Sequence, residues 1–128
     1  MENKKEIIKS FLEKGKTVIF VDSRKENVIL PDYLMNLIQV KLSLSYKYSY
    51  NIFLLTDEFL KIDLSFNKNK FVCEIPLEAI YLVASSDDTS DLVTFMESMP
   101  EIFIQMARDI ETLKESTNEI DFEEFFKK

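Results

Sequence analysis

Few side chains in this sequence of 128 residues could act as a nucleophile, a general base or a metal ligand. The chain has no histidine, one cysteine (Cys73) and one glycine (Gly15). Without histidine it can form neither a Ser-His or Cys-His pair nor a zinc site of cysteine and histidine, and one glycine cannot make a glycine-rich phosphate loop. A site built of carboxylates alone stays open, but we expect a protein that is not an enzyme and holds no cofactor or metal.

Cys73 is the strongest candidate for covalent chemistry. It alternates with Phe71 and Ile75 on an apolar face, so we expect an inert core residue. One cysteine cannot form an internal disulfide. The chain contains no run of about 18 apolar residues, so we expect no membrane span. The first residues lack the apolar stretch of a signal peptide. We therefore expect a cytoplasmic protein.

The net charge of −7 is unevenly distributed. Residues 1–84 carry 12 basic and 11 acidic side chains, whereas residues 85–128 carry 4 basic and 12 acidic ones. Nucleic-acid binding relies on lysine and arginine to displace counterions. We do not expect the whole chain to bind nucleic acid, although a local basic patch in the first part stays open.

Hydrophobic periodicity indicates the elements that position these residues. An apolar stripe predicts a helix over residues 4–14 that ends at Gly15, and residues 17–21 read as a buried strand. Alternation predicts strands over residues 38–46, 48–54, 60–66, 71–75 and 80–84, with turns at 56–58 and 67–69. The result is a mainly β, α+β fold in which an antiparallel sheet curls or closes to cover its edges.

The remaining residues differ in composition. We expect a loop at residues 85–91, helices at 91–97 and 100–114, and a linker at 115–121. The sequence divides into residues 1–84, a β-rich domain with an N-terminal helix, and residues 85–128, an acidic helical extension and tail.

Several short motifs occur in a recognisable order. They are TVIFVDS at residues 17–23, VILP at 28–31, IQVKLSL at 38–44, LSFN at 64–67 and IPLEAI at 75–80. Over residues 5 to about 84, their order and spacing resemble the family of stringent starvation protein B, adaptors that deliver ssrA-tagged proteins to the ClpXP protease. The resemblance implies a small Sm-like antiparallel β-barrel whose N-terminal helix mediates a homodimer.

The resemblance also implies a groove that binds the tag as an extended peptide. The LSFN motif would form one wall and the end of a neighbouring strand the other. The expected peptide-binding residues are Leu44, Tyr46, Tyr48, Leu64, Ser65, Phe66 and Asn67. The alternative is an ordinary hairpin with Phe66 in the core.

Two further contacts follow from the resemblance. The apolar stripe of the first helix, which could equally pack on the barrel, is the expected dimer interface: Ile7, Ile8, Phe11 and Leu12. The family ends in a motif that docks on the ClpX unfoldase, and the residues in that place here are Phe122, Phe125, Phe126, Lys127 and Lys128. These phenylalanines could instead fold back on the body of the protein.

Two other functions stay open. A single-stranded RNA-binding Sm-like module could stack bases on Tyr46, Tyr48 and Tyr50 beside Lys41 and Lys47. A structural partner subunit could use the acidic helical segment as its interface.

Overall fold

The computed structural model describes residues 3–88 and 90–117, and the side chains of the last helix as far as Ile110. The first helix, α1 (Lys4–Lys14), has the predicted bounds. It begins at residue 4 because the side chain of Asn3 caps it, accepting a hydrogen bond from Glu6 N at 2.9 Å. It ends at Gly15, whose φ of 155° and ψ of −157° lie outside the left-handed helical region but still in a positive-φ region that favours glycine.

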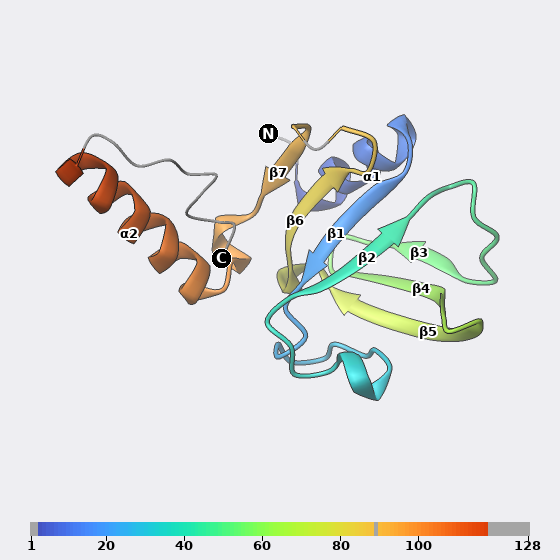
Figure 1. The fold of residues 1–128 in the computed structure, drawn as a ribbon. Helices are drawn as coiled ribbons and strands as arrows, with labels where there is room; N and C mark the ends of the chain where they lie inside the picture. Colours follow the sequence, from blue (N-terminus) through green and yellow to red (C-terminus); the bar gives the residue numbers. More distant parts are fainter. Residues whose placement is uncertain (1–2, 89, 118–128) are drawn as a thin grey trace.

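The strands form two antiparallel sheets, which Figure 1 shows running at a steep angle to each other. Their orders are β2-β1-β6-β7 and β3-β4-β5. The strands are β1 (Thr17–Val21), β2 (Val40–Leu44), β3 (Phe53–Leu55), β4 (Phe59–Phe66), β5 (Asn69–Pro76), β6 (Ile80–Ser85) and β7 (Leu92–Thr94). Short 3-10 helices are η1 (Asp32–Leu34), η2 (Leu77–Ala79) and η3 (Met96–Ser98).

The mainly β, α+β prediction is thus correct, but the closed barrel is wrong. Residues 45–52 were expected to lie mostly in strands, but they form a loop that connects β2 to β3. Within the described residues, β2 and β3 do not pair with each other. At the other end, Pro76 and η2 turn the chain away from β5, and β6 pairs with β1. A single bridge, Ile29 to Glu74, adds to the edge of β5.

The predicted helix at residues 91–97 is also wrong. Residues 92–94 form β7, which pairs with β6 in the register Val83 to Val93. Phe95 then enters the core at 6% exposure, and its N–H donates to Tyr81 O at 2.9 Å. The free edge of β6 therefore captures this segment, because pairing there both satisfies main-chain groups and buries Phe95.

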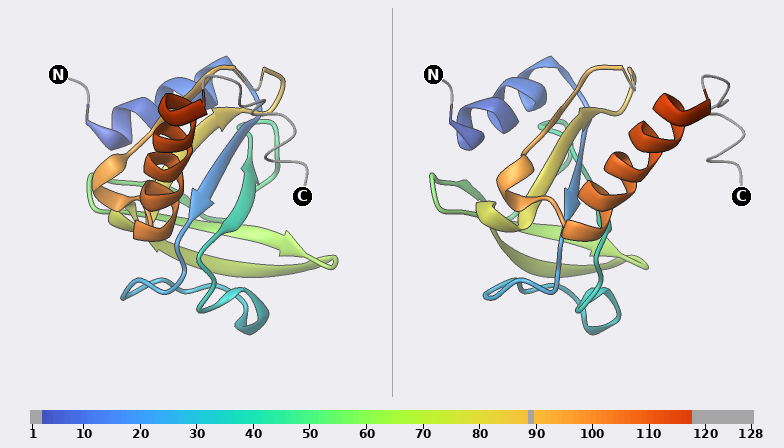
Figure 2. Two further views of the ribbon diagram at one scale, coloured as in Figure 1. Left: turned by 60° about the vertical axis from the view of Figure 1, so that its left-hand side comes forward. Right: turned by 90° about the vertical axis from the view of Figure 1, so that its left-hand side faces the viewer.

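Helix α2 (Glu101–Thr117) follows Pro100, as predicted, but includes the first residues of the expected linker. Its Phe103 packs on Tyr81 with ring centroids 6.0 Å apart. Beyond that contact, α2 extends away from the two sheets (Figures 1 and 2). Among the described residues, no helix is long and apolar enough to cross a membrane.

One core joins both sheets and α1. The amino group of Lys4 fixes α1 to this core: Nζ donates to Leu77 O at 2.7 Å, to Ile80 O at 2.9 Å and to Ser98 Oγ at 2.8 Å. Burial lowers the pKa of this amine. Because all three of its donors have acceptors, the amine ties the start of α1 to η2, β6 and η3.

The hairpin of β4 and β5 turns through two residues, Asn67 and Lys68, with φ of 51° and 71°. Phe66 pairs directly with Asn69, so Asn69 belongs to the strand rather than to the turn. Two central residues with positive φ match the right-handed twist of the strands. The turn therefore places residues 64–66 and Lys70 on opposite strands at the tip of one hairpin.

Candidate functional site

A groove lies between β2, the loop of residues 45–52 and the tip of the β4–β5 hairpin. Its cavity volume is about 720 Å³. Its lining is Lys41, Leu42, Ser43, Tyr48, Ser49, Tyr50, Asn51, Asp63, Leu64, Ser65, Phe66 and Lys70. We call this hollow the groove.

Strand β2 contributes a free edge to the groove. Directly after β1, Ser23 N donates to Leu37 O on the β2 side, at 2.9 Å. Odd-numbered residues of β1 therefore face β2, and their register partners are the even-numbered residues of β2. The main chains of Lys41 and Ser43 consequently point to the other side, where the described part of the chain provides no neighbouring strand. An extended peptide in the groove could pair with these groups.

The opposite wall is held by Asp63, which is 2% exposed. Its carboxylate accepts from Ile52 N at 3.0 Å and from Asn51 N at 3.1 Å. These main-chain donors, the Ile52 N–H first, hold the pKa of Asp63 below its ordinary value despite burial. The ionised carboxylate thus fixes the end of the 45–52 loop against β4.

Two more side chains stiffen this wall. Tyr50 Oη accepts from Ser45 N at 3.1 Å, and burial raises the pKa of this phenol. Lys70 Nζ donates to Ser49 O at 2.8 Å and lies 5.7 Å from the centroid of the Tyr50 ring. It also lies 3.8 Å from Asp63 Oδ2. The loop is therefore attached to both strands of the hairpin.

The structure brings four of the seven predicted peptide-binding residues to the groove: Tyr48, Leu64, Ser65 and Phe66. The other three lie elsewhere. Leu44 is fully buried in the core, Tyr46 packs on Phe53 at 5.6 Å between centroids, and Asn67 is exposed in the turn. Residues 64–66 thus form one wall, whereas the other wall consists of residues 41–43 of β2 and of Tyr48 rather than of the whole segment 44–48.

Sequence reasoning missed Ser43, Asp63 and Lys70, and it named Lys41 only for the RNA-binding alternative. Alternation did place Asp63 on the outer face of its strand, but gave no sign that a loop covers that face. A carboxylate between apolar neighbours, followed seven residues later by a lysine, is the signal that could have indicated a buried anchor.

The predicted dimer residues lie mostly inside the protein. Ile8, Phe11 and Leu12 are at most 6% exposed and belong to the core, and Ile7 is partly buried against it. Packing on the body, the alternative given for this stripe, thus accounts for Ile8, Phe11 and Leu12, and Ile7 lies at the edge of that contact. The expected unfoldase-docking residues Phe122, Phe125, Phe126, Lys127 and Lys128 lie outside the described residues.

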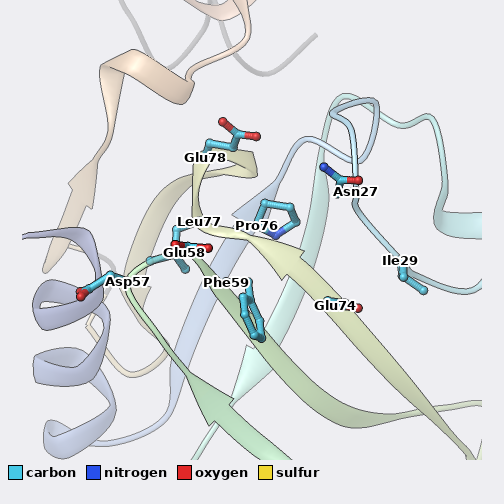
Figure 3. Close-up of a pocket in the computed structure, with 9 residues that line it drawn as sticks. All are labelled: Asn27, Ile29, Asp57, Glu58, Phe59, Glu74, Pro76, Leu77 and Glu78. Atoms are coloured by element: carbon cyan, nitrogen blue, oxygen red, sulfur yellow. The ribbon is translucent and has the colours of Figure 1, made fainter.

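A second hollow lies at the opposite end of the β4–β5 hairpin (Figure 3). We call it the acidic pocket, because aspartate and glutamate side chains line it and no lysine or arginine does. Its volume is about 580 Å³, and its lining is Asn27, Ile29, Asp57, Glu58, Phe59, Glu74, Pro76, Leu77 and Glu78. The main chain here is already paired: Leu77 N donates to Glu58 O at 2.9 Å, and Ile29 exchanges two hydrogen bonds with Glu74.

Neither hollow holds an activated nucleophile. Cys73 is fully buried between them, as predicted, and burial raises its thiol pKa to about 11. The thiol is therefore protonated at neutral pH. Within residues 3–88 and 90–117, no group of three or more His, Cys, Asp or Glu side chains could hold a metal ion. What the groove offers is polar main chain, aromatic rings and two ammonium groups.

No protein-family model matches the chain, and no curated protein matches it.

Proposed function

We propose that this protein is a non-enzymatic adaptor for proteolysis that binds an extended peptide in the groove. The observation that carries the proposal is the free edge of β2, which faces the LSF segment of residues 64–66 across a hollow. The resemblance to the family of stringent starvation protein B supplies the specific ligand, an ssrA-type degradation tag, and the recipient, the ClpXP protease.

Binding would add a strand to the sheet. The peptide main chain pairs with Lys41 and Ser43, and its side chains enter the space between Tyr48 and Phe66. The wall formed by Asp63 is already ordered, so little freedom is lost when the peptide binds. Affinity then comes from main-chain hydrogen bonds and apolar contact, without any chemical step.

Delivery would need a second contact, with the unfoldase. Holding tagged protein near the unfoldase raises its effective concentration, commonly to the millimolar range for short flexible links. The resemblance assigns that contact to residues 122–128 and implies a homodimer. Sedimentation of the wild-type protein tests the dimer, and removal of the residues after Ser116 tests the docking.

A fluorescence anisotropy titration with a labelled ssrA-type peptide tests the central proposal. We expect saturation in the micromolar range or tighter, about −8 kcal/mol or better. Ser65→Glu places a longer, negatively charged side chain in the groove from an exposed position and should abolish binding. Thr94→Glu, also exposed and on a strand but outside the groove, is the matched control. Absence of saturation at hundreds of micromolar would reject the adaptor.

One observation favours a second candidate, single-stranded RNA. The groove brings Tyr48 and Tyr50 together with Lys41 and Lys70, which is the combination of stacking surfaces and cations that such ligands need. Binding of a short oligouridine that weakens steeply with salt, and that Ser65→Glu abolishes, would support this candidate.

A further inference from the structure

The groove carries a net positive charge on a protein whose net charge is −7. Its charged lining consists of Lys41, Lys70 and Asp63. The carboxylate of Asp63 is buried, and each oxygen already accepts a main-chain N–H. A ligand in the groove therefore meets two ammonium groups and no exposed carboxylate.

Lys70 is held in place with donors to spare. Its side chain is 45% exposed, and Nζ uses one N–H on Ser49 O at 2.8 Å. Asp63 Oδ2, at 3.8 Å, is beyond hydrogen-bond distance. Because an ammonium has three N–H donors, Lys70 can still bind an anionic group. Its contacts with Ser49 and the Tyr50 ring already hold the side chain in place, so little side-chain freedom is lost when a ligand binds.

Lys41 lies on the other wall, on the free edge of β2. Its side chain is exposed, and no described residue forms a hydrogen bond or an ion pair with it. Ser43 is the next residue whose main chain faces the groove, about 6.6 Å further along the strand. A peptide that pairs with this edge would thus pass beside Lys41 along one side and Lys70 along the other.

We propose that the groove selects acidic peptides, with Lys41 and Lys70 binding aspartate or glutamate side chains of the extended ligand. This inference rests on the proposed function and specifies the class of peptide. The two lysines also offset the repulsion that the negatively charged protein exerts on an acidic ligand. Selectivity of this kind is strongest at low ionic strength, because salt screens charges on a half-exposed surface.

The test compares two peptides of the same length. One is an ssrA-type tag containing acidic residues, and the other has every Asp and Glu replaced by Asn and Gln. With the wild-type protein at low salt we expect the acidic peptide to bind about tenfold more tightly, as charge-assisted hydrogen bonds exceed neutral ones. The ratio should shrink as salt is raised.

Three variants locate the effect. Lys41→Gln and Lys70→Gln should each reduce the ratio between the two peptides, while Lys70→Arg should keep it. Lys61→Gln, on β4 but outside the groove, is the control that removes the same charge and should leave the ratio unchanged.

The outcomes separate the two levels of the proposal. Equal binding of both peptides by the wild type overturns the acidic selectivity and leaves the adaptor intact. Binding of neither peptide rejects the adaptor and this inference with it. Tighter binding of an oligouridine than of either peptide, with the same dependence on Lys41 and Lys70, would overturn the inference in favour of nucleic acid.

Discussion

The groove and the acidic pocket are built from opposite ends of the same hairpin. The groove uses the turn end of β4 and β5, including Ser65 and Lys70, and the acidic pocket uses the other end, including Phe59 and Glu74. Their charges are opposite. Two lysines face the groove, whereas four carboxylates line the acidic pocket: Asp57, Glu58, Glu74 and Glu78.

The two hollows also differ in their main chain. Around the acidic pocket, the main chain of Ile29 pairs with the edge of β5 at Glu74, and the first residue of η2 donates a main-chain hydrogen bond to Glu58 O. In the groove, β2 keeps one edge free. Both hollows have volumes of several hundred cubic ångströms, so volume does not distinguish a peptide site here. The groove differs in having main-chain donors and acceptors that are free to pair with a peptide.

The largest expected effect comes from the core that both hollows share. Phe11→Ala should lower the free energy of unfolding by about 3–5 kcal/mol, because it empties a buried position. Chemical denaturation followed by circular dichroism measures this, with exposed Glu13→Ala as the control on the same helix. A variant that keeps full stability but sediments as a smaller species than the wild type would instead restore Phe11 to a dimer seam.

The next prediction tests whether the free edge of β2 is the difference that matters. Ser43→Pro removes an N–H that points into the groove and spares the pairing of β2 with β1. We expect peptide binding to be lost while the fold is kept. Val72→Pro is the matched change on β5: since Glu74 pairs outward with Ile29, Val72 faces the same outer edge. Anisotropy should show normal binding by Val72→Pro, and equal losses in both variants would remove the distinction.

A smaller effect is expected from the carboxylates. Asp63→Asn leaves one acceptor oxygen for two main-chain donors, so the 45–52 loop should loosen and peptide affinity fall about tenfold. Glu74→Gln, in the acidic pocket, should leave affinity unchanged. Similar affinities for the two variants would show that the loop does not depend on Asp63.

Asp63 also predicts a pH dependence. Its pKa is lower in the folded protein than its ordinary 3.8, so its contribution to stability is complete above that value and is lost as the pH falls through the folded-state pKa. Melting temperatures measured between roughly pH 5 and pH 3 should therefore fall more in the wild type than in Asp63→Asn. Parallel curves would contradict this.

The smallest expected effect is a loss of stability at alkaline pH, and it concerns Cys73 on β5, between the two hollows. Cys73 has its pKa raised from 9.0 to about 11, so the stability linked to its buried thiol is complete below pH 9.0 and is lost as the pH rises toward 11. Cys73→Ala should flatten this alkaline loss in thermal melts. An unchanged slope would mean that the thiol has the same pKa in the folded and the unfolded protein.

Much of the fold could be predicted because local patterns are strong where one face is buried. Residues 4–14 and 17–21 have the predicted bounds, and the β4–β5 hairpin follows from its alternation. The pairing of strands depended on long-range contacts instead. Periodicity did not indicate that Asp63 accepts hydrogen bonds from Asn51 and Ile52, which attach the end of the 45–52 loop to β4.

The candidate site was predictable to the level of its walls. Residues 64–66 of the LSFN motif and Tyr48 do line one hollow, together with residues 41–43 of β2. The individual side chains were less accessible to prediction. Leu44 stays on the buried face of β2, as its alternation requires, and Tyr46 lies beyond the end of the strand. The covered position of Asp63 depends on a loop whose path no periodicity describes.

The free edge of β2 carries a cost for the protein in a crowded solution. An unpaired edge is a template for the strand of any neighbouring chain, and proteins commonly protect such edges with short strands and with lysine. Strand β2 has five residues, and Lys41 lies on it, exposed. The lysine that would attract an acidic peptide thus also discourages edge-to-edge aggregation, so replacing it to alter ligand preference would expose the protein to self-assembly at high concentration.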